Sequence, residues 1–456
     1  MTLADLRRRL MAPEVTCREL VDACLERIAD PAGEGRRTFI RVFDDVARAD
    51  ADALDQRLAA GEDPGPLAGM PLGVKDLFDI EGQVTLAGSA LRRDAPPASR
   101  DAEVVSRLRR AGAVLLGTTN MSEFALGTIG TNPHYGTPRN PWDRGAGEST
   151  GRAPGGSSSG CAVAVTDDMA VATVGTDTAG SVRVPAALCG LTGFKPTARR
   201  VSRMGVFPLS ESLDSVGPLA RSVDCCARLD AVLADEPVQR DEVSRPAPDA
   251  AHLTLGVLTT LVQDDLDGAV AAAYAGALET LRAAGVELVE LSVPALERIP
   301  GMCAHGGISL VEARVVHRDL LERAPAGFDG SVLRRLVLAG QITPADYRAR
   351  LAARTALIAE VAPLTAPFDA VLMPTCPQVA PTLADVADAE VWDAINRRYV
   401  QSNIIANLLD RCALSLPCGA PGGPPVGLTL MGPTLGDRRL LAFGATVERL
   451  LRREHA

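Results

Sequence analysis

The sequence predicts an α/β protein in which a large, mixed, twisted β-sheet forms the core and helices flank both of its faces. Short apolar runs typical of buried strands alternate with longer amphipathic runs typical of helices. Hydrophobic residues make up 46% of the 456 residues and charged residues 23%, as expected of a folded globular chain. Aromatic residues make up only 3%, so the core is expected to consist mainly of Ala, Val and Leu.

The first 65 residues are expected to form helices. Thr16 and Glu19 form a capping box, and an apolar stripe follows until Pro31. A second helix is expected from 44 to 60, where Gly61 ends it.

An α/β catalytic core is expected over 66–299 and 364–456, within a single domain that spans 1–456. The expected strands are 71–80, 113–117, 169–175, 252–259, 286–291, 368–375 and 426–431. The expected helices are 101–111, 266–284 and 437–453. Residues 300–363 have a helical pattern without a clear strand. We expect this insertion to lie over the site as a cap; a helical layer over the sheet is the alternative.

Charge and composition exclude several classes of protein. The net charge of −10 and the lack of a basic block argue against direct nucleic-acid binding. No apolar run reaches the roughly 18 residues that a membrane span needs. The ten cysteines form no Cys-x-x-Cys pair and histidine is sparse, so no metal site is expected. Together these features indicate a cytoplasmic protein.

Two serine-bearing loops are the strongest functional signal. Ser157 lies in the glycine- and serine-rich stretch 155–160, and Ser181 in the stretch 175–183. Backbones this bare can turn tightly and direct several N–H groups at one point. They are typical of a site that stabilises a developing negative charge.

A serine nucleophile needs a base, and the five histidines all lie outside these loops. His134 is the histidine best placed to take part, but a Ser-His-Asp triad is disfavoured because no buried strand precedes Ser157. Lys75 and Lys195 are the only lysines. Lys75 interrupts an apolar strand-like run, where burial would favour its neutral form; a lysine that snorkels from an edge strand is the alternative. Lys195 precedes Pro196 and is interpreted as a structural turn residue.

These stretches resemble the amidase signature family of Ser–cis-Ser–Lys hydrolases, and the resemblance runs from about residue 67 to 451. The matching motifs are Gly73-Val74-Lys75-Asp76, the stretches 117–124 and 154–160, the nucleophile loop 175–186, and the stretches 190–197 and 213–219. Two positions depart from the family pattern, because Ala179 and Ser159 stand where the family commonly has glycine.

The resemblance implies a role for each matching residue. Ser181 would be the nucleophile, Ser157 the bridging serine and Lys75 the base. A cis peptide is implied within the Gly156-Ser157-Ser158 backbone. The backbone N–H groups of Thr178, Ala179 and Gly180, with that of Ser181, would form the oxyanion hole, and an Asp177–Arg183 ion pair would fix the loop. No cofactor or metal is implied.

The implied function is hydrolysis of a carboxylic amide or urea-like C–N bond, other than a peptide bond, through a Ser181 acyl-enzyme. The sequence of the nucleophile loop is also similar to that of allophanate hydrolases. One alternative is the glutaminase (A) subunit of a tRNA-dependent amidotransferase, in which partner subunits could contact the tRNA. A non-catalytic scaffold is less favoured, since all three catalytic positions are intact.

The expected partner is a small-molecule amide substrate. A homodimer is expected, and a small accessory subunit is a further possibility. The residues expected to contact the substrate are Met121, Thr131 and His134 near the loop 128–137, and Arg314 and His317 in the helical segment. The last two could receive an acidic substrate, although a place on the helix surface is the alternative.

Overall fold

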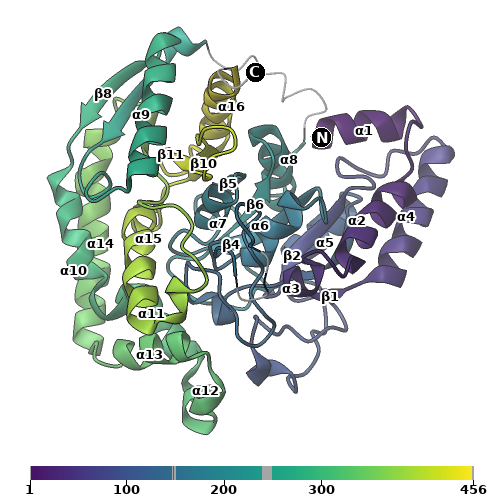
Figure 1. Cartoon of the computed structure of the whole chain (residues 1–456), viewed down its shortest axis with the longest axis horizontal. Helices are drawn as coiled ribbons and strands as arrows, with labels where there is room; N and C mark the ends of the chain where they lie inside the picture. Colours follow the sequence, from purple (N-terminus) through teal and green to yellow (C-terminus); the bar gives the residue numbers. More distant parts are fainter. Residues whose placement is uncertain (1, 146, 148–149, 239–248, 454–456) are drawn as a thin grey trace.

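The computed structural model describes residues 2–145, 147, 150–238 and 249–453. Eleven strands in this part of the chain form one mixed sheet in the order β1-β3-β2-β4-β6-β5-β10-β11-β9-β7-β8 (Figure 1). Their bounds are β1 Phe39–Val42, β2 Pro71–Lys75, β3 Val114–Thr119, β4 Ala172–Asp177, β5 Thr192–Lys195, β6 Ser215–Ala220, β7 Thr254–Leu258, β8 Glu287–Leu291, β9 Ala370–Pro374, β10 Ala413–Pro417 and β11 Gly427–Met431.

Helices cover both faces of this sheet. The central strands β2, β4 and β6 are buried along their whole length, which requires cover on each face. Helix α6 Ser159–Thr166 contacts all three of these strands, and α8 Val223–Leu233 contacts β6. Helix α7 Arg183–Leu188 contacts β5 and β10, and α16 Asp437–Arg453 contacts β10 and β11. The α/β fold class expected from the sequence is therefore confirmed.

Strands from distant parts of the chain share the sheet. β2 lies between β3 and β4 and is parallel to both. The late strands β9, β10 and β11 lie between β5 and β7, so residues 66–299 and 364–456 contribute to the same layer. The expected βαβ unit is present, with α9 Gly268–Ala283 joining the parallel strands β7 and β8.

The N-terminal region contains the expected helices and one strand that was not expected. Its helices are α1 Leu3–Met11, α2 Cys17–Ala29, α3 Gly35–Thr38 and α4 Asp44–Ala59. The Thr16 capping box is confirmed at the start of α2. β1 pairs antiparallel with β3 at the end of the sheet, so the purely helical interpretation of residues 1–65 was wrong.

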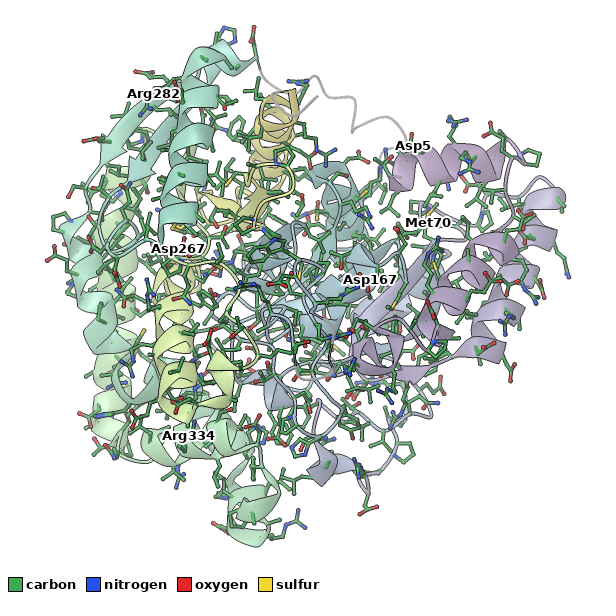
Figure 2. All side chains as sticks on the ribbon, viewed as in Figure 1. Asp5, Met70, Asp167, Asp267, Arg282 and Arg334 are labelled. Carbon is green, nitrogen blue, oxygen red and sulfur yellow. The ribbon has the colours of Figure 1, made fainter. Side chains whose placement is uncertain are left out.

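The segment that follows β8 is helical, as expected. Its helices are α10 Ile299–Met302, α11 Gly307–Val316, α12 Arg318–Arg323, α13 Gly330–Ala339 and α14 Pro344–Thr365. α11 packs against both α13 and α14, and α14 runs along the side of the molecule opposite the N-terminal helices (Figure 1). Charged side chains such as Arg282 and Arg334 point outward (Figure 2).

The strand expected over 71–80 ends at Lys75. The Lys75 carbonyl accepts from the N–H groups of Leu77 and Phe78, which turns the chain away from the sheet. The expected helix 101–111 is α5 Glu103–Arg110, and a long helix, α15 Ala389–Leu408, was missed. Within the described residues, no helix is long and apolar enough to cross a membrane.

Candidate active site

The ammonium group of Lys75 contacts the hydroxyl of Ser157. Lys75 is the last residue of β2, between two parallel neighbours, and its side chain is fully buried. Its Nζ donates to Ser157 Oγ at 2.7 Å and to Thr176 Oγ1 at 2.9 Å. The alternative of an exposed edge-strand lysine is therefore wrong.

Burial changes the acid–base behaviour of Lys75. Removal of its amine from water lowers the pKa of Lys75 to about 8, while Cys161, Asp214 and Asp177 act in the opposite direction. A substantial fraction of this lysine is then neutral near physiological pH, which a general base requires.

Ser157 is held by a tightly packed backbone that precedes α6. The Gly156–Ser157 peptide bond is cis. Gly156 N donates to Thr128 O at 2.8 Å, and Ser122 N donates to Ser157 O at 3.1 Å. A Cβ at position 156 would lie 2.8 Å from Ser122 Oγ, so only glycine fits here without movement of its neighbours.

Ser181 lies between β4 and α7, on the loop that follows the strand next to Lys75. Ser158 N donates to Ser181 O at 3.2 Å, which joins the two serine-bearing loops through their backbones. The Ser181 side chain is almost completely buried. Among the described residues, its hydroxyl has no hydrogen-bond partner, and so it is available to a ligand.

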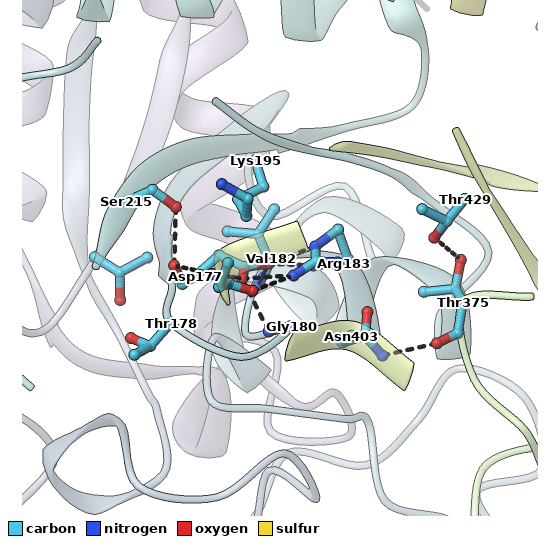
Figure 3. Close-up of polar contacts among 12 residues, drawn as sticks. Asp177, Thr178, Gly180, Val182, Arg183, Lys195, Ser215, Thr375, Asn403 and Thr429 are labelled. Atoms are coloured by element: carbon cyan, nitrogen blue, oxygen red, sulfur yellow. Dashed lines mark hydrogen bonds and ion pairs between the residues drawn. The ribbon is translucent and has the colours of Figure 1, made fainter. Parts of the chain in front are cut away.

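Asp177 organises the loop that carries Ser181 (Figure 3). Its carboxylate accepts from Gly180 N at 2.8 Å and Val182 N at 3.2 Å, and from Arg183 Nε and Nη2 at 3.0 and 2.9 Å. Both members of the Asp177–Arg183 pair are fully buried. Burial opposes ionisation of Asp177, but the Arg183 guanidinium prevails and holds the pKa of Asp177 below its usual range.

Helix α15, absent from the sequence-based prediction, completes this network. Asn407 Oδ1 accepts from Arg183 Nη2 at 2.7 Å, and Asn407 Nδ2 donates to Asp177 O and Oδ1 at 3.1 Å each. Asn403 packs on the loop, because a Cβ at Gly180 would lie 2.6 Å from Asn403 Cβ. The sequence signal for this helix was the Asp388 N-cap followed by twenty residues without an internal Gly or Pro.

Thr178 and Ala179 lie on the same loop and contact other parts of the fold. Thr178 Oγ1 donates to Asp214 Oδ1 at 2.5 Å. Burial raises the pKa of Asp214, although its hydrogen bonds from Thr178, Ser210 and Leu209 oppose this shift. Among the described residues, no acceptor is bonded to the backbone N–H groups of Thr178, Ala179 and Ser181.

The structure places the three expected substrate contacts near the loop 128–137 in different surroundings. Met121 is fully buried, and Thr131 Oγ1 accepts from Trp392 Nε1 at 3.1 Å. His134 Nε2 lies 2.9 Å from a carboxylate oxygen of the buried Glu123, and this contact raises the pKa of His134. His134 thus pairs with Glu123.

The two residues expected from the helical segment, His317 and Arg314, have different surroundings. His317 is fully buried among the rings of Phe124, Phe207 and Phe328, and burial lowers its pKa to about 4. Arg314 Nη1 donates to Leu336 O at 3.0 Å. For His317, both expectations were wrong: the residue faces neither an open site nor solvent, because its ring fills an aromatic cluster.

Arg335 on α13, which the sequence-based prediction omitted, is a second cation of the helical segment. Its Nη1 is buried and has no hydrogen-bond partner within the described residues. The guanidinium lies 5.8 Å from the centre of the Trp392 ring, and a Cβ at Gly127 would lie 3.8 Å from Nη1. Gly127 O accepts from Ser122 Oγ, and Ser122 N binds Ser157 O. Arg335 Nη1 therefore lies close to Gly127, which is linked to Ser157 through Ser122.

Lys195, interpreted as a turn residue, is the last residue of β5 and is also fully buried. Its Nζ donates to Pro196 O at 2.7 Å, and burial lowers the pKa of Lys195 to about 8. Lys75 is thus not unique in its pKa, and its contact with Ser157 is what distinguishes it. The part of the chain that the structure describes contains no cluster of three or more side chains that could hold a metal ion.

The chain is similar in sequence and in structure to known proteins. The family model named Amidase matches residues 19–441. The chain is 36% identical to 2-amino-5-chloromuconic acid deaminase of Comamonas testosteroni, over all of this chain and 97% of that protein. It is also 36% identical to the A subunit of glutamyl-tRNA(Gln) amidotransferase from Acidothermus cellulolyticus, over 98% of this chain and 94% of that one. A crystal structure of an amidase superposes with a TM-score of 0.88 at 35% identity, covering 98% of this chain and 99% of that chain. The chain belongs to the amidase family.

Proposed function

We propose that this amidohydrolase cleaves a small linear amide, and not an internal peptide bond, through a covalent Ser181 acyl-enzyme. The observation that carries the proposal is the 2.7 Å contact of a fully buried Lys75 amine with Ser157. It is supported by the Ser181 hydroxyl, which has no partner among the described residues and whose loop is bonded to that of Ser157 through Ser158 N and Ser181 O. The intact Lys75–Ser157 contact also argues against a non-catalytic scaffold.

The chemistry begins with proton transfer along the three side chains. Neutral Lys75 accepts the proton of Ser157, and Ser157 accepts the proton of Ser181 as Ser181 Oγ attacks the amide carbonyl. The relay returns a proton to the leaving amine as the C–N bond breaks. Water then attacks the acyl-enzyme, and the acid product leaves.

The oxyanion hole is proposed to consist of the backbone N–H groups of Thr178, Ala179 and Ser181. Gly180 N–H is already bonded to the Asp177 carboxylate, so Gly180 acts by shaping the loop. Ala179 stands where the family commonly has glycine, and its added methyl group leaves the backbone N–H in place. Loss of one such donor raises the barrier by roughly 3 kcal/mol in a comparable enzyme.

The substrate is proposed to carry a carboxylate. Burial lowers the pKa of Arg335 to about 10, so its guanidinium stays cationic at neutral pH. A buried cation with a free N–H favours an anionic ligand, and the fork of Arg fits a carboxylate. The name of the Comamonas relative, an acid deaminase, supports the same class of substrate.

Glutamine hydrolysis in a tRNA-dependent amidotransferase is the second candidate, favoured by the similarity to one of the subunits of such an enzyme. The two candidates differ in substrate range and in the need for partner subunits. As a further part of the proposal, the amidase acts as a homodimer in the cytoplasm, where its ten unpaired cysteines would remain reduced. Size-exclusion chromatography at twice the chain mass would support the dimer.

A substrate panel tests the proposal. The panel contains an aliphatic amide, an aryl amide, their carboxylate-bearing counterparts, a urea-like amide, glutamine and a short peptide with a free C-terminus. We expect release of ammonia or amine from a carboxylate-bearing amide and no cleavage of the peptide. Turnover of glutamine alone would support the second candidate, the amidotransferase subunit. The proposal would be overturned if the protein hydrolyses no member of the panel and its Ser181 is also unreactive.

A further inference from the structure

Glu312 links the helical segment to the loop that carries Ser181. It lies on α11 and accepts four hydrogen bonds. The donors are Ser210 Oγ and Ser212 Oγ at 2.5 Å each, Tyr347 OH at 2.6 Å and Ser212 N at 3.0 Å. One carboxylate thus joins α11, α14 and the segment 209–214.

The segment 209–214 is in turn fixed to the site. Asp214 Oδ2 accepts from Leu209 N at 2.9 Å and Ser210 N at 3.0 Å, while Asp214 Oδ1 accepts from Thr178 Oγ1. Ser210 is therefore held at its hydroxyl by Glu312 and at its N–H by Asp214. A continuous chain of hydrogen bonds runs from Tyr347 and Glu312 to Thr178.

Apolar packing follows the same route. Leu213 of this segment belongs to one buried cluster with Ile308 of α11 and Met302 of α10. Ala179, the residue after Thr178, packs against this cluster. The loop that carries Ser181 is thus supported by the helical segment through polar and apolar contacts.

We propose that Glu312 is a positioning residue for amide hydrolysis, which holds the N–H groups of Thr178 and Ala179 in place for the oxyanion through Ser210 and Asp214. This inference rests on the proposed Ser181 chemistry. Four neutral donors on one carboxylate give charge-assisted bonds, which are shorter and stronger than bonds between neutral groups. A glutamine at 312 keeps the shape but replaces one acceptor oxygen with a donor.

The experiment compares Glu312→Gln with Glu211→Gln as a matched control. Glu211 lies in the same segment, but its side chain is exposed and pairs with Arg203. We expect Glu312→Gln to lower kcat roughly tenfold or more with KM within about twofold, because the bonds to the oxyanion form only in the transition state. Glu211→Gln should match the wild type.

A double-mutant cycle with Thr178→Val separates positioning from general loss of structure. If Glu312 acts through Thr178, the double variant should be no slower than the slower single variant. The inference would be overturned if the fold-losses in kcat of the two single variants multiply in the double variant. An unchanged kcat in Glu312→Gln would also overturn it. If Glu312→Gln fails to fold, Tyr347→Phe removes a single donor and should still lower kcat without raising KM; an unchanged kcat there would also overturn it.

Failure of this inference can be distinguished from failure of the proposed function. The wild type serves as the reference for both. If wild-type protein reacts at Ser181 and hydrolyses an amide while Glu312→Gln is equally fast, only the positioning role is wrong. If the wild type does neither, the proposed function is wrong.

Discussion

Lys75 Nζ lies 2.7 Å from Ser157 Oγ, with both side chains fully buried. The contact joins two segments 82 residues apart, the end of β2 and the backbone before α6. In the proposed mechanism this buried amine is the base for Ser157 and Ser181, because burial favours its neutral form.

The pH dependence of hydrolysis should report the Lys75 amine. Because burial lowers the pKa of Lys75 to about 8, its active neutral form increases as the pH rises. We expect kcat/KM to rise about tenfold per pH unit below 8 and to level off above it. Burial also lowers the pKa of Lys195 to about 8, so Lys195→Met is the control. This variant should keep the rise of kcat/KM below pH 8. If Lys195→Met loses this rise in kcat/KM, the rise reports Lys195 and not Lys75.

Replacement of Asp177 should lower the free energy of unfolding. Asp177→Asn leaves the Arg183 charge buried without its partner, at a cost of about 3–5 kcal/mol in the free energy of unfolding. The pKa of Asp177 is lower in the folded protein than in the unfolded chain. The ion pair therefore contributes its full stabilisation of the fold above the ordinary carboxylate pKa, and this contribution is lost as the pH falls through the lower pKa of the folded protein. Urea unfolding at neutral pH measures the difference. Equal midpoints for variant and wild type would show that the pair contributes nothing.

Gly180→Ala should disrupt the loop that carries Ser181. The added methyl would lie 2.6 Å from Asn403 Cβ, on a backbone with φ of +110° that other residues rarely adopt. We expect at least a tenfold lower kcat/KM together with a lower Tm. Gly276→Ala is the matched control, since nothing lies within 4 Å of its methyl. This control on α9 should gain about 0.5–1 kcal/mol of stability. A fully active Gly180→Ala would contradict the packing described.

His317 should make the fold less stable in mild acid. Burial lowers its pKa to about 4, whereas an exposed histidine titrates near 6.5. The unfolded chain therefore binds a proton in this window that the folded chain does not, and stability falls as the pH drops from about 6.5 to about 4, by about 3 kcal/mol. Unfolding curves of His317→Leu over this window should lack that slope. An identical slope in both proteins would exclude His317 as its source.

Arg335 should determine affinity for carboxylate-bearing amides. We expect Arg335→Met to raise KM for such a substrate by roughly tenfold or more and to leave KM for its uncharged counterpart nearly unchanged, since only the former loses a charge-assisted bond. The ratio of kcat/KM for the two substrates is the measurement. Arg334→Met, an exposed neighbour on α13, is the control. A ratio that does not change would remove Arg335 from substrate binding.

The sequence predicted the fold class and the placement of Lys75, because local patterns and family motifs both lie in contiguous stretches. The sequence also contained Asp177 and Arg183 within one motif, and the structure brings them together as a buried pair.

The residues that were missed lie far from the motifs in the sequence. Asn407 reaches Asp177 from 230 positions away, and Glu312 reaches Ser210 from 102. The patterns of α11 and α13 resemble those of any half-buried helix. Only tertiary packing shows that His317, which follows α11, faces three phenylalanine rings, and that Nη1 of Arg335 on α13 lacks a partner among the described residues. Strand β1 was missed because four residues between two helices give too short a pattern to detect.

The central claim is tested most directly by mass spectrometry of the native protein after reaction with a fluorophosphonate, which forms an Oγ–P bond and releases fluoride. We predict a single adduct on Ser181 in the wild type, and no adduct at the same time point in a folded Lys75→Met variant. An adduct on another residue, or labelling of Lys75→Met at the wild-type rate, would contradict the account.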